Sequence, residues 1–391
     1  MAFKVKTKGQ NEGEKLLKPK LRFKEFNDNW TLISLNSLME FKNGINAAKN
    51  AYGKGIKYIS VTDILNNNFI TYEKIKGLVN IDNITLKNNS VTYGDVVFQR
   101  SSETIEDIGR ANVYLDHNKV ATFGGFVIRG KKKGDYNPLF INYLLQNSSS
   151  RKAIIVKGAG AQHYNISQEE LEKIELYFPS IQEQEKIANL LSLLDKKIEL
   201  QKQKIEALKI YKKWLSKKLF SFNSIYEKKL GDLCSITTGK LDANAMNKNG
   251  KYRFFTCAKE YYYINTYAFD TEALLISGNG AYVGYINYYK GKFNAYQRTY
   301  VLDKFNEDIF YIKYFLDEFL PLRIFSEKKD GNTPYIVLST LSNMTIKFPA
   351  FNIQKIIVNI LSELDKKINL SEERLKLLSR LKNFLLQQMF I

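Results

Sequence analysis

The chain contains few groups of side chains that could carry out catalysis. A metal-dependent nuclease needs clustered carboxylates and a lysine to bind Mg²⁺ and polarise a water molecule. Two places match that requirement loosely, Asp28 with residues 40–42 (Glu-Phe-Lys) and Asp317 with residues 327–329 (Glu-Lys-Lys). Such matches arise often in a chain rich in Lys and Glu, so a nuclease is an alternative hypothesis and not the favoured one.

Motifs for cofactors and nucleophiles are also lacking. No loop ends in Gly-Lys-Ser/Thr, so we do not expect the chain to hydrolyse ATP. The glycine-rich run 278–284 precedes a second strand-like segment, 285–289, which favours a hairpin over a nucleotide-binding loop. His163 has no evident Ser or Cys partner for nucleophilic catalysis. Cys234 and Cys257 do not have the spacing of a zinc site, and we expect both to be inert core residues.

The chemistry that the sequence does offer is recognition of base edges. Side chains of Arg, Lys, Asn, Gln, Ser and Thr read DNA bases through hydrogen bonds, with aromatic contacts beside them. Such residues cluster near the ends of strand-like segments in two regions of the chain, and the clustering favours recognition over solvated loops. The candidate DNA-binding residues are Asn43, Thr62, Gln99, Arg100, Ser101, Arg110, Gln162, His163, Lys240, Lys259, Tyr261, Asn279, Tyr282, Gln297, Arg298 and Asn332.

The charge of the chain points to a polyanionic partner. Fifty-nine Lys and Arg against 40 Asp and Glu leave a formal net charge of +19. Each phosphate that a basic side chain neutralises releases counterions and so adds affinity. A membrane surface is the rival partner, but it usually attracts one concentrated basic helix, whereas these charges are spread among 25 Tyr and 25 Phe. We therefore favour nucleic acid, and we note no apolar run long enough to span a membrane.

The segment that would position the candidate residues occurs twice. Residues 178–220 and 348–390 are identical at 17 of 43 positions without a gap, at a constant offset of 170. Both copies open with Phe-Pro-x-x-x-x-Gln and both contain Leu-Asp-Lys-Lys-Ile. A weaker match at an offset of 195 aligns Gly44 with Gly239 and two leucines before each. The 391 residues therefore divide into a variable region, a shared segment, a second variable region and a second shared segment.

Both shared segments have the apolar spacing of long helices. Apolar residues alternate at intervals of four and three, which indicates a coiled coil. Polar residues interrupt the pattern at equivalent places, Gln201 and Lys212 in one copy and Ser371 and Lys382 in the other. We predict helices over 181–219 and 351–390; two unrelated amphipathic helices, each packed on its own domain, are the alternative. The predicted coiled-coil residues are Ile187, Leu191, Leu194, Ile198, Ile205, Leu208, Ile357, Leu361, Leu364, Ile368, Leu375 and Leu378.

The variable regions are predicted to be mixed, mainly β domains. Strand-like runs lie at 57–61, 95–98, 122–129, 253–255, 273–276 and 296–302, bounded by Gly, Asn and Asp. Short helices are predicted over 138–146, 167–173 and 308–319. The sequence thus predicts an α+β fold, in which two mainly β domains are joined by two long antiparallel coiled-coil helices with pseudo-twofold symmetry. Such helices would form a rod that carries the two domains at its opposite ends.

This arrangement resembles the specificity subunit of type I restriction–modification enzymes. The resemblance rests on the two Phe-Pro openings, on the Leu-Asp-Lys-Lys-Ile helices, and on segments similar to the family's target-recognition domains at 58–64, 94–98, 254–260 and 278–280. It covers essentially the whole chain after residue 20. One departure lies in the second opening, where Asn-Ile-Gln-Lys stands in place of Gln-Glu-Gln-Glu, so we do not expect equal contacts at the two helix starts.

The resemblance implies a non-catalytic subunit that reads a bipartite, asymmetric DNA target. Its implied parts are a polar N-terminal segment (1–24), target-recognition domain 1 (25–177), spacer helix 1 (178–222), target-recognition domain 2 (223–347) and spacer helix 2 (348–391). Two methyltransferase subunits and motor–nuclease restriction subunits are the implied partners. S-adenosylmethionine, ATP and Mg²⁺ are implied on those partners, with no cofactor on this chain. We expect a cytoplasmic protein.

The sequence leaves the target itself open. Recognition domains vary on one scaffold, so neither the bases of each half-site nor the length of the unread spacer can be predicted from the residues. A coiled-coil tether that binds nucleic acid without sequence preference is the further alternative hypothesis.

Overall fold

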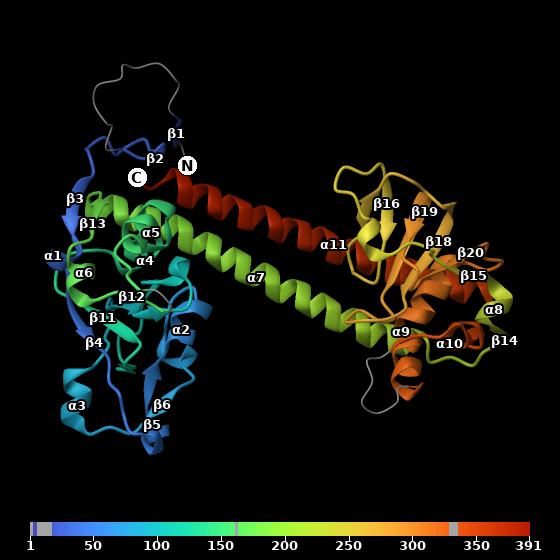
Figure 1. The fold of residues 1–391 in the computed structure, drawn as a ribbon, viewed down its shortest axis with the longest axis horizontal. Coiled ribbons are helices and arrows are strands. Elements are labelled where there is room, and N and C mark those ends of the chain that lie inside the picture. The colour runs from blue at the N-terminus through green and yellow to red at the C-terminus, as the bar shows by residue number, and fades with distance from the viewer. Residues whose placement is uncertain (1–2, 6–17, 161–162, 328–334) are drawn as a thin grey trace. The chain divides into compact units, whose positions relative to one another are not determined.

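A computed structural model of the chain describes residues 3–5, 18–160, 163–327 and 335–391. It forms two compact units: unit 1 comprises residues 1–201 and 374–391, and unit 2 comprises residues 202–373. Two long helices, α7 (Ile181–Leu219) and α11 (Phe351–Gln388), each contribute to both units (Figure 1). α7 begins in unit 1 and ends in unit 2, whereas α11 begins in unit 2 and ends in unit 1.

Unit 1 is mainly β. Its strands are β1 (Phe3–Val5), β2 (Leu21–Phe23), β3 (Thr31–Ser34), β4 (Met39–Asn43), β5 (Tyr52–Ile59), β6 (Leu78–Val79), β7 (Val96–Gln99), β8 (Ser101–Ser102), β9 (Ala111–Val113), β10 (Thr122–Phe123), β11 (Val127–Lys132), β12 (Tyr164–Asn165) and β13 (Glu175–Phe178). Its short helices are α1 (Leu35–Leu38), α2 (Val61–Asn66), α3 (Asn83–Asn88), α4 (Pro138–Gln146), α5 (Ser148–Ile155) and α6 (Gln168–Glu172). The two larger sheets have the strand orders β4-β11-β7-β9 and β10-β5-β6.

Unit 2 is built on one larger sheet. Its strands are β14 (Tyr226–Lys229), β15 (Ser235–Thr238), β16 (Tyr252–Phe255), β17 (Tyr262–Ile264), β18 (Phe269–Ser277), β19 (Ile286–Ala295), β20 (Thr299–Asp303) and β21 (Thr345–Phe348). Its shorter helices are α8 (Leu230–Leu233), α9 (Ile309–Glu327) and α10 (Leu338–Ser342). The six-stranded sheet has the order β15-β20-β18-β19-β16-β17, and β14 pairs with β21.

The predicted α+β fold is confirmed, and the local differences have local causes. Val61 begins α2 and does not extend the preceding strand, because Ser60 and Asp63 form a capping box in which the Ser60 N–H donates to Asp63 Oδ2 at 2.8 Å. Residues 296–298 form a turn, so β20 begins at Thr299. The predicted hairpin after β18 is present, but with an eight-residue loop, 278–285.

The Phe-Pro-x-x-x-x-Gln opening has a structural role in each unit. The Gln184 side chain donates from Nε2 to the Pro179 carbonyl at 3.0 Å, and Gln354 donates in the same way to Pro349 at 3.0 Å. The phenylalanine before each proline is buried. The glutamine therefore ties the end of a strand to the first turn of a long helix, which fixes the direction in which the helix leaves the sheet.

In unit 1, the start of α7 packs against the end of α11. Lys382 of α11 forms an ion pair with Asp195 of α7 at 2.6 Å, and the Tyr143 hydroxyl of α4 donates to the other carboxylate oxygen at 2.8 Å. The two charged side chains are only 15% and 8% exposed. The lysine that interrupts the predicted apolar pattern is therefore the partner of a buried acid on the other helix.

In unit 2, the end of α7 packs against the start of α11 through the same set of groups. Lys212 of α7 pairs with Asp365 of α11 at 2.5 Å, and the Tyr314 hydroxyl of α9 donates to Asp365 at 3.0 Å. Lys212 and Asp365 stand 170 residues from Lys382 and Asp195. Each helix thus gives an acid to one unit and a lysine to the other. The helices run antiparallel, because the start of each meets the end of the other.

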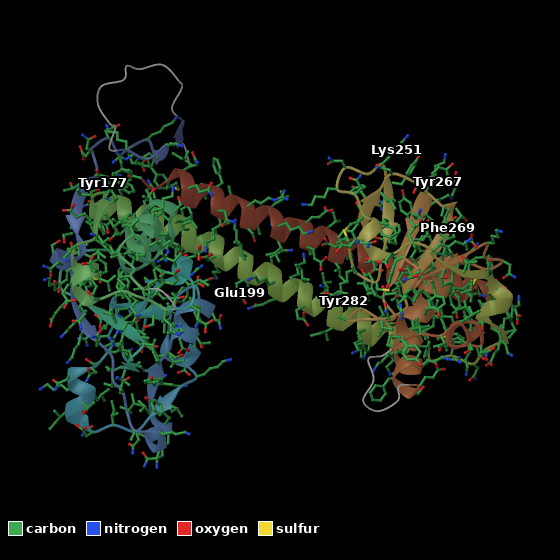
Figure 2. All side chains as sticks on the ribbon, in the orientation of Figure 1. Tyr177, Glu199, Lys251, Tyr267, Phe269 and Tyr282 are labelled. Carbon is green, nitrogen blue, oxygen red and sulfur yellow. The ribbon has the colours of Figure 1, made fainter. Side chains whose placement is uncertain are left out.

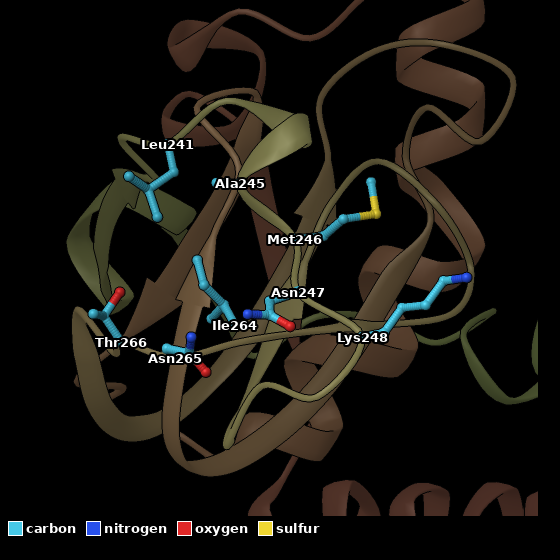
Figure 3. A pocket seen from close by; sticks show the side chains of 8 residues that line it. All are labelled: Leu241, Ala245, Met246, Asn247, Lys248, Ile264, Asn265 and Thr266. Carbon is cyan, nitrogen blue, oxygen red and sulfur yellow. The ribbon is translucent and has the colours of Figure 1, made fainter.

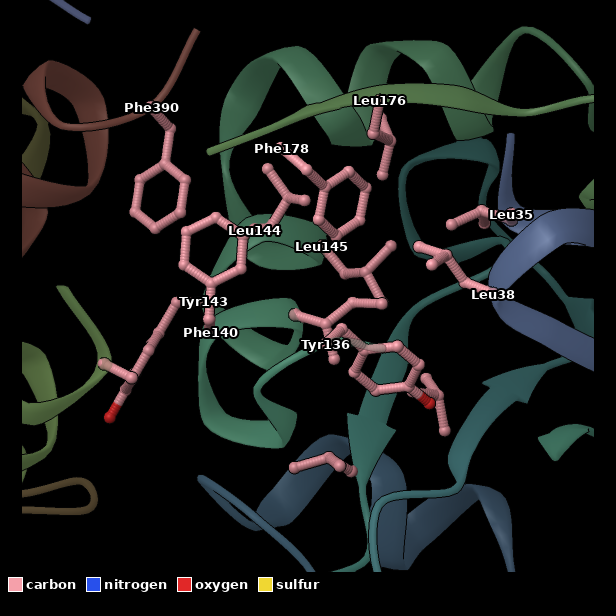
Figure 4. Packing of buried hydrophobic residues seen from close by; sticks show 14 of the residues in the cluster. Leu35, Leu38, Tyr136, Phe140, Tyr143, Leu144, Leu145, Leu176, Phe178 and Phe390 are labelled. Carbon is pink, nitrogen blue, oxygen red and sulfur yellow. The ribbon is translucent and has the colours of Figure 1, made fainter. Parts of the chain in front are cut away.

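Each long helix ends in the core of the unit that it enters. Phe390, after α11, packs against Trp30 and Phe140 of unit 1, with ring centroids 6.3 and 5.5 Å apart (Figure 4). Phe220, after α7, packs against Tyr311 and Phe315 of unit 2 at 5.8 and 5.7 Å. Neither core is complete without residues from both halves of the sequence.

The predicted coiled-coil residues lie on the packed faces of the helices. Nine are buried, and Leu208, Leu375 and Leu378 are partly buried. The nine are Ile187, Leu191, Leu194, Ile198, Ile205, Ile357, Leu361, Leu364 and Ile368.

The sequence difference between the first turns of α7 and α11, Gln-Glu-Gln-Glu against Asn-Ile-Gln-Lys, has a physical explanation. Glu183, in the first turn of α7, accepts two hydrogen bonds of 2.7 Å from the guanidinium of Arg22 on β2, and both side chains are buried. The equivalent position of α11 holds Ile353, which is exposed. Because the carboxylate serves the N-terminal segment, which the second half of the chain does not repeat, no acid is needed there.

We predict that replacing Asp195 with Ala lowers the free energy of unfolding by about 3–5 kcal/mol, because Lys382 and Tyr143 lose a buried partner. Urea unfolding followed by circular dichroism measures the change. Glu363→Ala is the matched control, since its ion pair with Lys366 is exposed to solvent and is expected to contribute little to stability. Equal effects of the two substitutions would contradict the structural role of the buried pair.

Candidate nucleic-acid interface

In unit 1, the carboxyl ends of four strands meet at one turn. β4 and β7 end opposite the start of β11, and β5 ends beside the end of β10. All four therefore end next to residues 124–126, which connect β10 to β11. Gly124 N donates to Ile59 O at 3.0 Å, and Arg100 N donates to Phe126 O at 2.9 Å, so backbone hydrogen bonds hold the turn in place.

Four of the predicted base-reading residues lie at this end of unit 1. Asn43 and Gln99 are the last residues of β4 and β7, and Arg100 and Ser101 follow Gln99. Arg100 donates from Nη1 to Gly125 O at 3.3 Å. A guanidinium has five N–H groups in a fixed fork, so this bond orients the side chain and leaves donors for a ligand.

In unit 2, the turn 296–298 between β19 and β20 has the same surroundings. β15 and β18 end opposite the start of β20, and β16 ends beside the end of β19 in a parallel pair. Tyr296 N donates to Phe255 O at 2.9 Å, and Gly278 N donates to Arg298 O at 2.9 Å. The predicted residues Lys240, Asn279, Gln297 and Arg298 all belong to this turn or to the loops beside it.

A glycine marks the same close approach in both units. A Cβ atom on Gly44 would lie 2.0 Å from the carbonyl oxygen of Gly124, and one on Gly239 would lie 1.9 Å from that of Ala295. No side chain fits at such distances. These glycines are the pair aligned by the offset of 195, so the repeat in the sequence corresponds to one backbone arrangement that occurs twice.

The side chains on this repeated backbone differ between the units. The turn is Gly-Gly-Phe at 124–126 in unit 1 and Tyr-Gln-Arg at 296–298 in unit 2. Gln99 and Arg100 of unit 1 stand where unit 2 has Ser277 and Gly278. The two units therefore present different hydrogen-bonding groups from equivalent places.

Unit 2 adds cations that lie against aromatic rings. Lys259 Nζ lies 5.2 Å from the ring centre of Tyr282. Tyr282, which is labelled in Figure 2, belongs to the loop after β18. Arg253 lies 4.2 Å from Tyr261 and 4.6 Å from Tyr289. Aromatic faces hold such cations in place at the surface of the protein, where they can contact phosphates or base edges.

A hollow of about 680 Å³ lies next to the unit 2 turn (Figure 3). Leu241, Met246 and Ile264 form apolar parts of its lining, and Asn247 and Lys248 bring polar groups. Leu241 O accepts a hydrogen bond from the Gln297 N–H at 2.9 Å, so the hollow adjoins the candidate interface.

Other predicted residues lie beside these strand ends with their side chains engaged elsewhere, on neighbouring elements, or outside the described ranges. Gln99 N donates to Arg110 O at 2.7 Å, so the backbone of Arg110 adjoins the end of β7. The Arg110 side chain pairs with Asp107 at 2.5 Å and lines a separate hollow. Thr62 is exposed on α2, and His163 is exposed before β12. Gln162 and Asn332 lie outside the residues that the structure describes.

The structure also adds residues that sequence reasoning missed. Phe126 is 68% exposed at the tip of the unit 1 turn. Asn165 accepts a hydrogen bond of 2.5 Å from Ser101, and Tyr335, which is exposed, forms a bridge with Asn279. The sequence Gly-Gly-Phe at 124–126 is a local pattern that could have predicted an exposed aromatic residue at a turn. Asn165 and Tyr335 are far from their partners in the sequence and had no such signal.

The alternative hypothesis of a metal-dependent nuclease predicts clustered carboxylates. Within the ranges given above, no three His, Cys, Asp or Glu side chains gather in a way that could hold a metal ion. Asp317 and Glu327 stand ten residues apart on α9, about 15 Å along the helix axis, and cannot share one Mg²⁺ ion. No helix in the described part of the chain is long and apolar enough to cross a bilayer.

The chain thus consists of two β-rich units that present different side chains on one framework, and two long helices that pack together. The model of the type I restriction modification DNA specificity domain matches residues 27–209 and 224–380. These ranges include most of the chain, which therefore belongs to the family of type I restriction–modification DNA specificity subunits.

Individual relatives are distant or match in part. The chain is 38% identical to the EcoDI specificity subunit of Escherichia coli over 148 residues, which are 38% of this chain and 32% of that protein. It is 23% identical to the MjaIX specificity subunit of Methanocaldococcus jannaschii over 411 residues, which cover 92% of each protein. The match thus spans about a third of the first relative and nearly all of the second.

Solved structures share the fold. The S subunit of a type I restriction–modification system from Mycoplasma genitalium superposes with a TM-score of 0.64 at 20% identity, covering 96% of this chain and 99% of that one. A chain from work on assembly and conformational transition of the type I system gives a TM-score of 0.58 at 14% identity, covering 91% and 96%.

We predict that Cys257 reacts with thiol reagents at pH 8 and that Cys234 does not. Burial, followed by the charge of Asp303, raises the pKa of the Cys234 thiol from 9.0 to about 12, so about one molecule in 10⁴ holds the thiolate at pH 8. Cys257 is half-buried beside Arg298, to whose carbonyl it donates at 3.3 Å. Ellman's reagent counts the reactive thiols.

The expected count is one in the native protein and none in Cys257→Ser, which serves as the control. Rapid reaction of two thiols, or of Cys234 in the variant, would contradict the raised pKa of the partly buried Cys234 thiol.

Proposed function

We propose that this chain is the DNA-reading subunit of a type I restriction–modification complex and that it recognises a bipartite, asymmetric target. One observation carries the proposal: the same strand-end framework occurs twice and bears different side chains at equivalent places. Unit 1 would read one half of the target through Arg100 and its neighbours, and unit 2 would read the other half through Gln297 and Arg298. Different side chains in equivalent places require different half-sites.

The long helices would set the distance between the half-sites. A pair of antiparallel helices that share two ion pairs would resist sliding along its axis, because sliding one helix would separate Lys212 from Asp365 and Lys382 from Asp195. A fixed distance between two readers leaves a run of unread bases of fixed length.

Catalysis in the complex would belong to partner subunits. The proposed partners are two methyltransferase subunits, which use S-adenosylmethionine, and motor–nuclease subunits, which use ATP and Mg²⁺. This chain would supply recognition and assembly in the cytoplasm. Its net charge of +19 would add affinity for any duplex, on which base contacts impose selectivity.

We predict that Arg298→Ala and Arg100→Ala each reduce the preference for the cognate sequence by about 1–3 kcal/mol, because a bidentate contact to guanine is worth that much. The measurement compares the Kd of the assembled complex for the target duplex with its Kd for duplexes mismatched in either half-site. Each substitution should relax only one half-site.

Arg110→Ala is the matched control, since Arg110 adjoins the end of β7 through its backbone but its side chain pairs with Asp107. A loss of affinity that is uniform over all sequences would reassign the arginine to phosphate contacts. An unchanged preference in both variants would contradict the proposed interface.

A further inference from the structure

The turn that bears Phe126 is closed and anchored by backbone hydrogen bonds. Val127 N donates to Gly124 O at 2.8 Å, which makes residues 124–127 a β-turn with Phe126 at its third position. Phe126 O accepts from Arg100 N at 2.9 Å. The backbone on both sides of Phe126 is therefore held in place, while its ring is 68% exposed.

The unit 2 turn has the same backbone hydrogen bonds. Thr299 N donates to Tyr296 O at 2.8 Å, and Arg298 O accepts from Gly278 N at 2.9 Å. Arg298 is thus the third residue of a β-turn that is closed and anchored as the unit 1 turn is. Phe126 and Arg298 therefore stand at equivalent positions of two equivalent turns.

The exposure of Phe126 is unusual because of what surrounds the ring. Isolated exposed apolar residues are ordinary on protein surfaces. Phe126, however, stands on a fixed turn among the polar side chains at the ends of β4 and β7. One of these, Arg100, donates from Nη1 to the carbonyl of Gly125, the residue before Phe126, at 3.3 Å. The ring is thus an apolar group placed among the proposed base readers.

The equivalence of the turns places the Phe126 ring at the edge of a base in the major groove. In the proposed function Arg298 makes a bidentate contact to guanine, and the two acceptors for that contact, O6 and N7, lie in the major groove. A side chain at the equivalent position of unit 1 would reach the same groove of the other half-site. The ring cannot form an N–H or O–H hydrogen bond, and the apolar group that a base pair presents in the major groove is the C5-methyl of thymine.

Insertion of the ring between base pairs is the alternative. Apolar wedges of that kind are typical of proteins that bind the minor groove. Because the equivalence with Arg298 places Phe126 in the major groove, contact with a methyl group is the interpretation that the two turns favour.

We propose that Phe126 selects a thymine in the unit 1 half-site by packing against its C5-methyl group. The inference rests on the proposed function and adds one base to the target that the sequence left open. Arg100, beside the ring, would read a base pair in the same half-site. Unit 2 has an arginine at the equivalent position, so the requirement for this thymine applies to one half-site only.

Deoxyuridine, which differs from thymidine only by the missing C5-methyl group, tests the proposal. The probes are duplexes that carry the methylated motif of a host expressing the complex, with each thymine of both strands replaced in turn. The assembled complex of the full chain and its methyltransferase subunits should bind about fourfold more weakly when one particular thymine is replaced, which is the contribution of one buried methyl group. That thymine should lie in the half-site that Arg100→Ala relaxes.

Three variants assign the effect to the ring. Phe126→Ser should bind the thymidine and deoxyuridine probes equally at that position and keep the wild-type profile at the others. Phe126→Leu retains an apolar side chain and should retain a preference for thymidine. Leu32→Ser, which removes an exposed leucine from β3 in a separate sheet, is the control and should keep the whole wild-type profile. Unchanged thermal unfolding shows that these effects do not come from misfolding.

The outcomes separate the inference from the proposed function. If no deoxyuridine in the half-site relaxed by Arg100→Ala weakens binding of the wild type, or if the thymidine preference survives Phe126→Ser, the inference fails and the proposed function stands. An equal loss of affinity of Phe126→Ser for every probe would assign the ring to insertion between base pairs and overturn the inference. Loss of a methyltransferase copy would overturn it by assigning the ring to that subunit. A wild-type complex that binds the motif no more tightly than a scrambled duplex would overturn the proposed function itself.

Discussion

The antiparallel pairing of α7 and α11 is the constraint on which the rest of the molecule depends. Each helix starts on the sheet of one unit and ends in the core of the other, where Phe390 and Phe220 pack against aromatic side chains. Each helix also contributes an acid to one unit and a lysine to the other. The ion pair between the helices in unit 1, Lys382 with Asp195, therefore repeats in unit 2 as Lys212 with Asp365.

This arrangement separates stability from recognition. The framework consists of glycines at close approaches, backbone hydrogen bonds at the strand ends, and helix openings held by Gln184 and Gln354. The turn at 124–126 belongs to this framework in part, because a Cβ on Gly124 would lie 2.0 Å from the Tyr58 hydroxyl oxygen and one on Gly125 would lie 1.8 Å from Asn46 Oδ1. Phe126, the third residue of the turn, is 68% exposed, so its side chain can differ from that of Arg298 in unit 2 without disturbing these close approaches.

The sequence predicted the framework better than the interface. The repeat at an offset of 170 and the apolar spacing gave the extent of α7, because a long helix has a strong periodic signal. The candidate interface includes contacts between residues far apart in the chain, such as Ser101 with Asn165, which no local pattern reports. Arg110 stays a predicted DNA-binding residue, and the structure adds that its side chain pairs with Asp107, three residues away. The interruptions Lys212 and Lys382 looked like breaks in the packing and proved to be its polar partners.

The central claim is that a duplicated helix pair holds two different readers at a fixed distance. Methylome sequencing of a host that expresses the complex tests it most directly, with the wild-type chain and with a chain that carries one extra heptad within both 200–208 and 370–378. One heptad adds about 10.5 Å, or about three base pairs. A seven-residue insertion at 221–225, between α7 and β14, is the control. The account predicts a bipartite motif whose unread gap lengthens by about three base pairs only in the helix variant, with both half-sites unchanged. A continuous motif, or a gap of the same length in all three chains, would contradict it.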